Sequence, residues 1–191
     1  YIIEKICGLS FKISAKTFFQ TNSTQAKQLF YLVKKFLEPN KEDILYDLYT
    51  GIGTIGQILS KNVKKVVGID IVEDSIKYAT ENSKLNNLSN TKYFAGDMKS
   101  IFTTQFILEN GKPTLLVVNP PREGIYIKVI EKIIDIKPKK IVYVSCNSST
   151  LARDLASFKK KYEISKLQTV DMFPHTSHVE NVVLLKKLIN V

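Results

Sequence analysis

Cys146 is the residue of this sequence best placed to act as a nucleophile. It follows an apolar run at 141–145 that predicts a strand, and it lies just before residues 148–160, which predict a helix capped by Ser148 or Ser149. A cysteine between a strand end and a helix N-terminus meets the positive end of the helix dipole, which stabilises the thiolate. A lone cysteine is usually inert core filler, so only this position favours chemistry.

Two apolar runs that predict strands carry a carboxylate near their end. The first opens the stretch 44–56, which predicts a strand that delivers Asp47 and runs into a glycine-rich loop and then a helix, and the second, at 65–70, ends in Asp70. An acid at the end of a second strand can accept hydrogen bonds from both hydroxyls of a ribose. The sequence therefore predicts a cofactor that contains an unphosphorylated ribose.

Three glycines, Gly51, Gly53 and Gly56, follow the first of these runs. Glycine lets the backbone turn sharply and approach a ligand where a side chain would block it. The same spacing also serves tight packing of a strand against a helix without any ligand, so the pattern alone is weak evidence. Together with Asp70 it favours a cofactor loop.

Three further polar residues are expected to lie near this cofactor loop. Gln20 lies just before a predicted helix, and Asp97 follows the predicted strand 91–95, where it could simply cap the next helix. Asn119 follows the predicted strand 114–118 and begins N-P-P-R, whose prolines make a rigid corner. Ligands bind at such strand ends in open sheets.

The order of the remaining elements favours an α/β domain. Strands and helices alternate with short links, which is typical of a mostly parallel sheet with helices on both faces. Residues 1–19 predict a short strand or hairpin with a turn at Cys7-Gly8, and a helix follows from Asn22 or Ser23. The other predicted strands cover 163–170 and 182–189, and the other predicted helices cover 73–87, a polar segment within 98–112, and 125–136.

Composition bounds the function. The 191 residues are 44% hydrophobic, which suits one domain with a substantial core, and they contain no apolar run of about 18 residues that would span a membrane. Lysine and arginine total 28 against 18 acids, a net charge of +10, which favours a polyanionic partner unless the lysines are only solvated. The two cysteines lack the spacing of a zinc site, and we expect a reducing cytoplasm and no metal.

Five motifs in combination resemble the RNA 5-methyluridine methyltransferases, which depend on S-adenosylmethionine. The resemblance covers essentially the whole chain and implies a Rossmann-like methyltransferase fold with a mostly parallel seven-stranded sheet. The motifs are F-F-Q-T-N at 18–22, D-x-Y-x-G-x-G at 47–53, N-P-P-R at 119–122, S-C-N at 145–147 with T-L-A-R-D at 150–154, and F-P-H-T-x-H-V-E at 173–180.

The resemblance also assigns roles. It implies that Cys146 adds to C6 of uracil and that Glu180 removes the proton from C5. It implies S-adenosylmethionine as the cofactor, with Asp70 on the ribose and Asp97 near the adenine. The other expected cofactor-binding residues are Gln20, Tyr49, Gly51, Gly53 and Asn119.

One departure leaves alternatives open. The family usually has Asp at the first position of its D-P-P-R motif, whereas Asn119 resembles the N-P-P motif of amino-methyltransferases, which need no cysteine. A protein of this fold that only binds RNA is a third possibility. In structural terms, Cys146 could be a buried strand residue and Glu180 a surface charge.

The resemblance implies an RNA partner. The T-L-A-R-D segment looks more like the 23S ribosomal RNA branch than the transfer RNA branch. Family members usually carry further amino-terminal parts, often an RNA-binding OB-fold, so we expect residues 1–191 to be one catalytic domain of a longer protein. Such a domain is expected to be a monomer that binds RNA weakly by itself.

Overall fold

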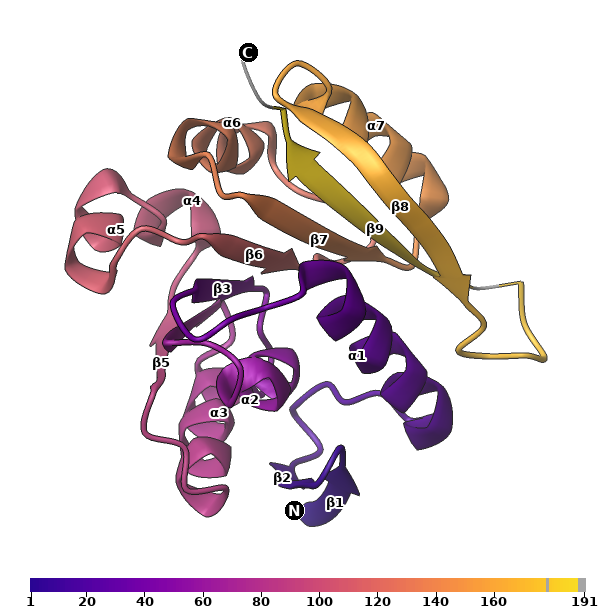
Figure 1. The fold of residues 1–191 in the computed structure, drawn as a ribbon. Helices are drawn as coiled ribbons and strands as arrows, with labels where there is room; N and C mark the ends of the chain where they lie inside the picture. Colours follow the sequence, from indigo (N-terminus) through magenta and orange to yellow (C-terminus); the bar gives the residue numbers. More distant parts are fainter. Residues whose placement is uncertain (178, 189–191) are drawn as a thin grey trace.

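A seven-stranded sheet forms the centre of the computed structural model, which describes residues 1–177 and 179–188 (Figure 1). Its strands are β3 (Ile44–Leu48), β4 (Lys65–Asp70), β5 (Thr91–Ala95), β6 (Leu115–Val118), β7 (Lys140–Ser145), β8 (Tyr162–Val170) and β9 (Glu180–Lys187). Their order is β5-β4-β3-β6-β7-β9-β8, and β9 alone in this sheet runs antiparallel to its described neighbours β7 and β8. The predicted α/β fold with a mostly parallel seven-stranded sheet is confirmed.

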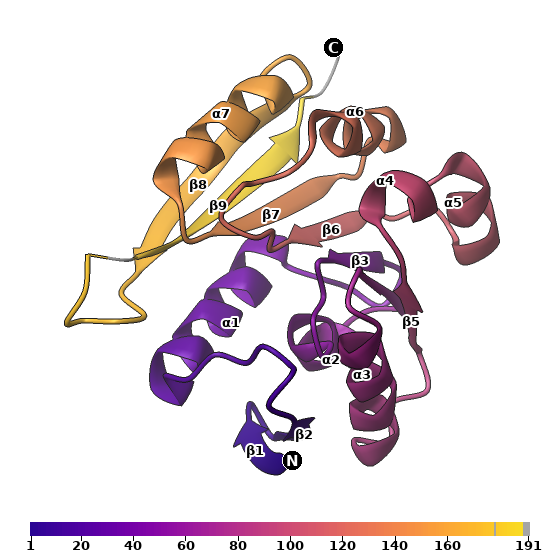
Figure 2. The same ribbon diagram turned by 180° about the vertical axis from the view of Figure 1, so that it is seen from behind.

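Helices cover both faces of this sheet, as Figures 1 and 2 show from opposite sides. One face carries α1 (Ser23–Leu37), α2 (Thr54–Ser60) and α3 (Glu73–Leu85). The other face carries α4 (Met98–Ile101), α5 (Thr104–Asn110), α6 (Ile127–Ile136) and α7 (Ser148–Phe158). No helix in the described part of the chain combines the length and the apolar character that a membrane span requires.

The central strands are apolar throughout because both of their faces are covered. Successive side chains of a strand point to opposite faces, so β3, β4, β6 and β7 each contribute to two separate cores. One core includes Leu45, Val66, Val117 and Val142, and the other includes Tyr46, Val67, Leu116 and Ile141. Burial on both sides makes the ends of these strands a rigid platform for the loops that follow.

The N-terminal residues form the predicted hairpin. Strands β1 (Ile2–Ile6) and β2 (Leu9–Ile13) pair antiparallel around Cys7 and Gly8, which both have positive φ. The side chain of Asn82 in α3 exchanges two hydrogen bonds with the backbone of β2, at 2.7 and 3.2 Å. The hairpin is therefore attached to the helical layer and not to the central sheet.

Asn22 is the cap of α1, one of the two residues predicted for it. Its side-chain oxygen accepts from Gln25 N at 3.1 Å, and its Nδ2 donates to Met172 O at 3.1 Å. The same amide thus fixes the start of α1 and the loop that follows β8. His178, in the same loop, lies outside the described residues, as does Ile189 at the predicted end of the last strand.

Two predicted helix boundaries are wrong. The polar segment within 98–112 is not one helix: it breaks after α4, and Thr103 Oγ1 caps α5 by accepting from Phe106 N at 3.1 Å. Its apolar residues, including Met98 and Phe102, enter the core. The start of α7 is capped by neither predicted serine but by Asn147, whose side chain accepts from the backbone N–H groups of the next turn.

Candidate active site

The predicted site residues meet at one edge of the sheet, where the parallel strands end. Because β9 is antiparallel, its first residue lies at this same edge. Open α/β sheets bind their ligands there. Gln20 precedes α1, Tyr49, Gly51 and Gly53 follow β3, Asp70 ends β4, Asp97 follows β5, Asn119 follows β6, Cys146 follows β7 and Glu180 begins β9.

A pocket at this edge brings four of the predicted cofactor residues together. It is lined by Gln20, Tyr49, Gly51 and Asn119, with aromatic and aliphatic side chains around them. Gln20 lies in a loop, yet its side chain is buried, and it forms part of the pocket wall. Asp47 also lines the pocket, a placement that the sequence did not predict.

Asp47 presents an unsatisfied acceptor to this pocket. Its Oδ2 accepts from Thr50 Oγ1 at 2.7 Å and from Gly56 N at 2.9 Å, whereas Oδ1 is buried without a hydrogen-bond partner among the described residues. Burial raises the pKa of this carboxyl to about 6. A buried oxygen of this kind suits a cationic group of a ligand. The only sequence signal for it is an acid inside an otherwise apolar strand.

The glycine loop serves both packing and the pocket. Gly53 has a φ of +83°, and a Cβ there would lie 2.8 Å from Gln57 Nε2 and 2.9 Å from Tyr93 Oη. Gly51 also has positive φ, but a Cβ there would meet no heavy atom of the described residues within 4 Å. Gly53 is therefore needed for close packing, and Gly51 borders open space beside the pocket.

Asp70 ties the glycine loop to the end of β4. Its Oδ2 accepts from Gly51 N at 2.8 Å and its Oδ1 accepts from Val72 N at 3.0 Å. A carboxylate has further lone pairs, so these bonds leave capacity for the hydroxyls of a ligand. Ile71, 65% exposed, follows directly and offers an apolar surface beside the carboxylate.

Asp97 caps α4, and its Oδ1 accepts from Lys99 N at 3.1 Å. Capping of the next helix was one of the two roles predicted for Asp97 from the sequence. Asp97 does not line the pocket that contains Asp47. Its contact with adenine remains a prediction.

Cys146 and Glu180 leave adjacent strands at the same edge. Ser145 of β7 pairs with Asn181 of β9, and this is the last register pair before both residues. Cys146 is half-buried and lies beyond the end of its strand, so it is not a buried strand residue. Glu180 is only 9% exposed, so the alternative that it is a surface charge is wrong.

The carboxyl of Glu180 is the second buried acceptor of this edge. Its Oε2 has no hydrogen-bond partner among the described residues, and burial raises its pKa to about 7. A carboxyl group with this pKa can exchange a proton near neutral pH, which suits a general base. The edge therefore combines a thiol, a buried carboxyl with a raised pKa and a polar pocket.

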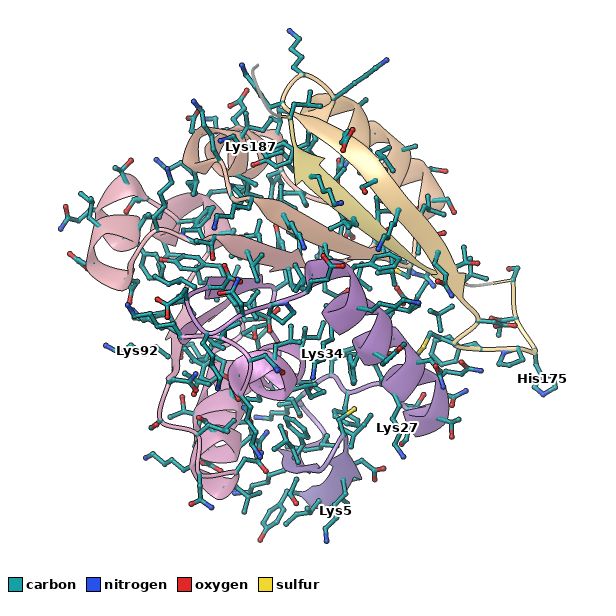
Figure 3. All side chains as sticks on the ribbon, viewed as in Figure 1. Lys5, Lys27, Lys34, Lys92, His175 and Lys187 are labelled. Carbon is teal, nitrogen blue, oxygen red and sulfur yellow. The ribbon has the colours of Figure 1, made fainter. Side chains whose placement is uncertain are left out.

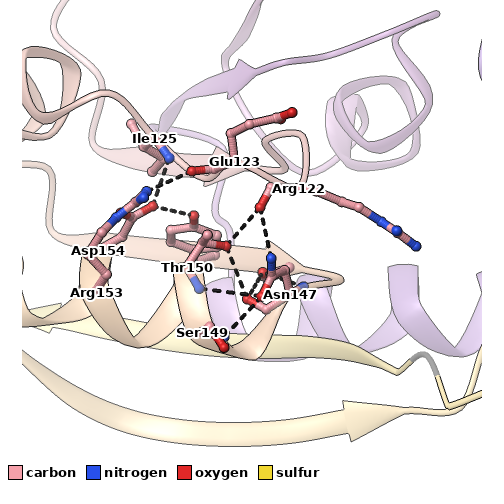
Figure 4. Close-up of polar contacts among 10 residues, drawn as sticks. Arg122, Glu123, Ile125, Asn147, Ser149, Thr150, Arg153 and Asp154 are labelled. Carbon is pink, nitrogen blue, oxygen red and sulfur yellow. Dashed lines mark hydrogen bonds and ion pairs between the residues drawn. The ribbon is translucent and has the colours of Figure 1, made fainter.

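The first turns of α7 hold the loop that carries N-P-P-R (Figure 4). Asn147 Nδ2 and Thr150 Oγ1 both donate to Arg122 O, at 3.1 and 3.0 Å, and Arg153 Nη2 donates to Glu123 O at 2.7 Å. These bonds fix consecutive carbonyl groups of the loop. Since α7 begins just after Cys146, they also fix the loop relative to the thiol.

Asp154 completes this attachment. The carboxylate is 1% exposed and accepts from Ile125 N at 2.7 Å, from Tyr143 Oη at 2.8 Å and from Arg153 Nε at 2.9 Å (Figure 4). It thus links the loop, β7 and α7. A Cβ at Gly124, where φ is +80°, would lie 2.5 Å from Asp154 Oδ2, so the loop passes too close for a side chain. We call the contacts of Asn147, Thr150, Arg153 and Asp154 with this loop the α7 clamp.

Comparison with known proteins assigns this arrangement to a family. The family model described as tRNA (Uracil-5-)-methyltransferase matches residues 5–188. The chain is 44% identical over 186 residues to an uncharacterized RNA methyltransferase of Bacteroides thetaiotaomicron and 48% identical over 187 residues to one of Porphyromonas gingivalis. Each alignment covers 97% of this chain but only 41% and 40% of those relatives.

Solved structures agree with this assignment. The tRNA (uracil-54, C5)-methyltransferase of Pyrococcus abyssi, in complex with S-adenosyl-L-homocysteine, is 34% identical with a TM-score of 0.84, over 96% of this chain and 44% of that one. The tRNA m1G37 methyltransferase of M. jannaschii has a TM-score of 0.73 at 19% identity, over 98% of this chain and 57% of that one. This second similarity concerns the fold alone.

Proposed function

Because the chain belongs to the tRNA (uracil-5-)-methyltransferase family, we propose that it transfers a methyl group from S-adenosylmethionine to C5 of a uridine in RNA. One observation carries the proposal: a half-buried thiol, Cys146, and a buried carboxyl without a partner, Glu180, leave paired strands at the same edge. Transfer to an exocyclic nitrogen would need neither group. The chain spans about two fifths of its curated relatives, and in those longer proteins it would form the catalytic part.

The pocket suits this cofactor. Bound S-adenosylmethionine would supply an electrophilic methyl group, and its amino-acid end carries an ammonium group. Asp47 Oδ1, which lacks a partner among the described residues, would accept from the ammonium, while Gln20 and Asn119 line the same pocket. Asp70 would accept from the ribose, and Asp97 would lie near the adenine.

Cys146 would activate the uracil. C5 of uracil is a poor nucleophile until a group adds to C6. The thiolate forms a bond to C6, and the electron pair of the C5–C6 double bond moves into an enolate. The enolate carbon C5 would then form its bond to the methyl group, while the bond from that methyl group to the sulfonium sulfur would break and its electron pair would stay on the sulfur.

Glu180 would complete the reaction. Its carboxylate removes the proton from C5, the electrons of that C–H bond restore the C5–C6 double bond, and the bond from sulfur to C6 breaks. The products would be 5-methyluridine, S-adenosylhomocysteine, the free thiolate and a proton on Glu180, which the carboxyl then gives up to water. A pKa near 7 leaves enough carboxylate at neutral pH and makes it a stronger base than an ordinary glutamate.

Two RNA classes are candidates for the substrate. The T-L-A-R-D segment favours ribosomal RNA, whereas the family description and the Pyrococcus abyssi neighbour name transfer RNA. Three residues of that segment, Thr150, Arg153 and Asp154, belong to the α7 clamp, which gives them a structural reason to be present besides substrate choice. We retain ribosomal RNA as the prediction, and sequencing of methylated uridines in both RNA classes from a deletion strain would decide.

The chain would act as a monomer, since every proposed site residue comes from one copy.

Tritium release tests the proposed reaction: RNA labelled with [5-³H]uridine loses tritium to water only when C5 is substituted. Cys146→Ser should abolish the release, while Cys7→Ser, which changes an exposed cysteine in the hairpin turn, should not. Release that survives Cys146→Ser would contradict the proposal.

A further inference from the structure

We propose that a groove between α4 and α6 holds single-stranded RNA beside the target uridine, with the ring of Tyr126 stacked on a base. The inference rests on the proposed function and adds to it the path of the substrate over the domain. Three observations support the inference: lysines line the groove, Tyr126 is exposed beside one of them, and both lie close to the proposed site.

The groove is basic and large enough for a phosphate chain to enter. Its volume is about 330 Å³, and its described lining contains three lysines and no carboxylate. A neighbouring cavity of about 340 Å³ shares Lys132 and adds Lys112 and one acid, Asp135. Lysines along a groove attract the RNA backbone without regard to sequence. The lysines of the first cavity are Lys99, Lys128 and Lys132.

Tyr126 is an unusual residue for its place in the fold. It is the N-cap of α6 and makes no side-chain capping bond, although a short polar side chain at this position would stabilise the helix. The residue is 58% exposed, and Lys99 Nζ lies 3.5 Å from the ring centroid. This cation orients the ring. An oriented, exposed aromatic ring flanked by lysines is a stacking platform for a base of any sequence.

The groove opens beside the proposed site. In the chain, α4 follows the end of β5 and α6 follows the loop after β6, so both helices come after the carboxyl ends of parallel strands. A further cavity of about 610 Å³ is lined by both Tyr126 and Tyr49, and Tyr49 also lines the pocket that contains Asp47. The loop just before Tyr126 is held by the α7 clamp, through Ile125 N and Glu123 O. RNA in the groove would therefore lie within a few nucleotides of a uridine at Cys146.

Net charge alone would not locate such a surface. Lysines project from many elements, among them Lys5 of β1, Lys27 of α1, Lys92 of β5 and Lys187 of β9 (Figure 3). The groove differs because its three lysines line one cavity, and one of them, Lys99, also lies over the exposed Tyr126. Three consecutive lysines at 159–161, between α7 and β8, offer a matched control, because this turn lies at the opposite edge of the sheet.

The test measures the salt dependence of binding. A fluorescein-labelled, uridine-containing RNA 15-mer is titrated with the 191-residue chain at several salt concentrations, followed by fluorescence anisotropy. Changing Lys99, Lys128 and Lys132 together to Gln should reduce the slope of log K against log salt by about two, since each phosphate contact contributes about 0.7. The triple Gln variant of residues 159–161 removes the same charge and should change the slope by less than half as much.

Tyr126→Ala separates stacking from charge. It should weaken binding at least about fivefold while leaving the salt slope unchanged. Equal loss of slope in the two triple variants, or full affinity in Tyr126→Ala, would overturn the proposed RNA path. Calorimetric S-adenosylmethionine affinity should stay at the wild-type value in all variants. Wild-type RNA binding without tritium release would instead count against the proposed reaction and leave the groove in place.

Discussion

Ser145 and Asn181 form the last register pair between β7 and β9, and Asn181 Nδ2 donates to Ser145 O at 3.4 Å. The next residue of one strand is Cys146, and the residue before the other partner is Glu180. Because the strands are antiparallel, both side chains belong to one end of the pair. Insertion of an antiparallel strand into a parallel sheet thus brings the carboxyl of Glu180 to the edge where the thiol lies.

Glu180 should control the pH dependence of turnover. Its pKa of about 7 predicts that turnover rises with pH through about 7, as the carboxyl loses its proton, and then levels off. Glu180→Gln should allow addition and methylation but not release, so a methylated covalent adduct with unmodified RNA should accumulate. A pH–rate profile and denaturing gels measure both effects. Normal turnover in Glu180→Gln would remove this residue from the reaction.

The same shift predicts a change in stability. A carboxyl whose pKa is raised by folding, here from 4.5 to about 7, lowers the free energy of unfolding as pH increases between these values. Glu180→Gln lacks this penalty. Its Tm relative to wild type should therefore increase from pH 5 to pH 8, and a constant difference would contradict the buried, ionisable state of Glu180.

Asp47 and Asp70 should determine cofactor affinity. Asp47→Asn replaces the unpartnered oxygen by a neutral amide, and Asp70→Ala removes the proposed ribose acceptor, so each should weaken S-adenosylmethionine binding about tenfold or more. Asp74→Asn, at an exposed acid in the first turn of α3, is the matched control. Calorimetry measures the affinities, and unchanged affinity in Asp70→Ala would take Asp70 out of the site.

The α7 clamp should matter for turnover more than for cofactor binding. Tyr143→Phe removes the hydroxyl that donates to Asp154, whereas Tyr162→Phe removes a similar buried hydroxyl that donates to Pro138 O at 2.9 Å, at the other end of the sheet. Each loss should cost about 1 kcal/mol of unfolding free energy. Only Tyr143→Phe should lower kcat for tritium release. Equal kcat in the two variants would show that the clamp is merely structural.

Asn119 should tolerate the acid that the family usually has. Asp has nearly the same shape, and Asn119 lines the pocket without a role that requires its amide protons in the structure described. Asn119→Asp should retain turnover at pH 8, while Asn119→Ala should lose most of it. Single-turnover kinetics on both variants provide the measurement. Loss of turnover in Asn119→Asp would show that a neutral donor is needed and would favour amino-methyltransferase chemistry.

Local sequence patterns predicted the strands well, because buried parallel strands must be apolar along their length. The bounds of β4 and β5 match the predicted runs at 65–70 and 91–95. The predicted site residues then lie at one edge because topology leaves few other arrangements. This part of the site follows from short-range signals.

Features that depend on distant contacts were not predictable in this way. The free oxygen of Asp47 is visible only once the pocket exists, and the attachment of Asp154 to Ile125 joins residues that are 29 positions apart. The break between α4 and α5 was missed because Phe102 and Phe106 are drawn into the core by tertiary packing. Such contacts override local propensity.

The proposed reaction depends on covalent addition of the Cys146 sulfur to C6 of uracil. RNA that carries 5-fluorouridine at the target should form a covalent complex with the protein in the presence of S-adenosylmethionine, because after methyl transfer C5 has fluorine in place of the proton that Glu180 would remove. The complex is measured as a shifted band under denaturing conditions, with Cys7→Ser as the matched control. The account predicts trapping by the wild type and Cys7→Ser and none by Cys146→Ser, and methylation of ordinary uridine RNA by Cys146→Ser would contradict it.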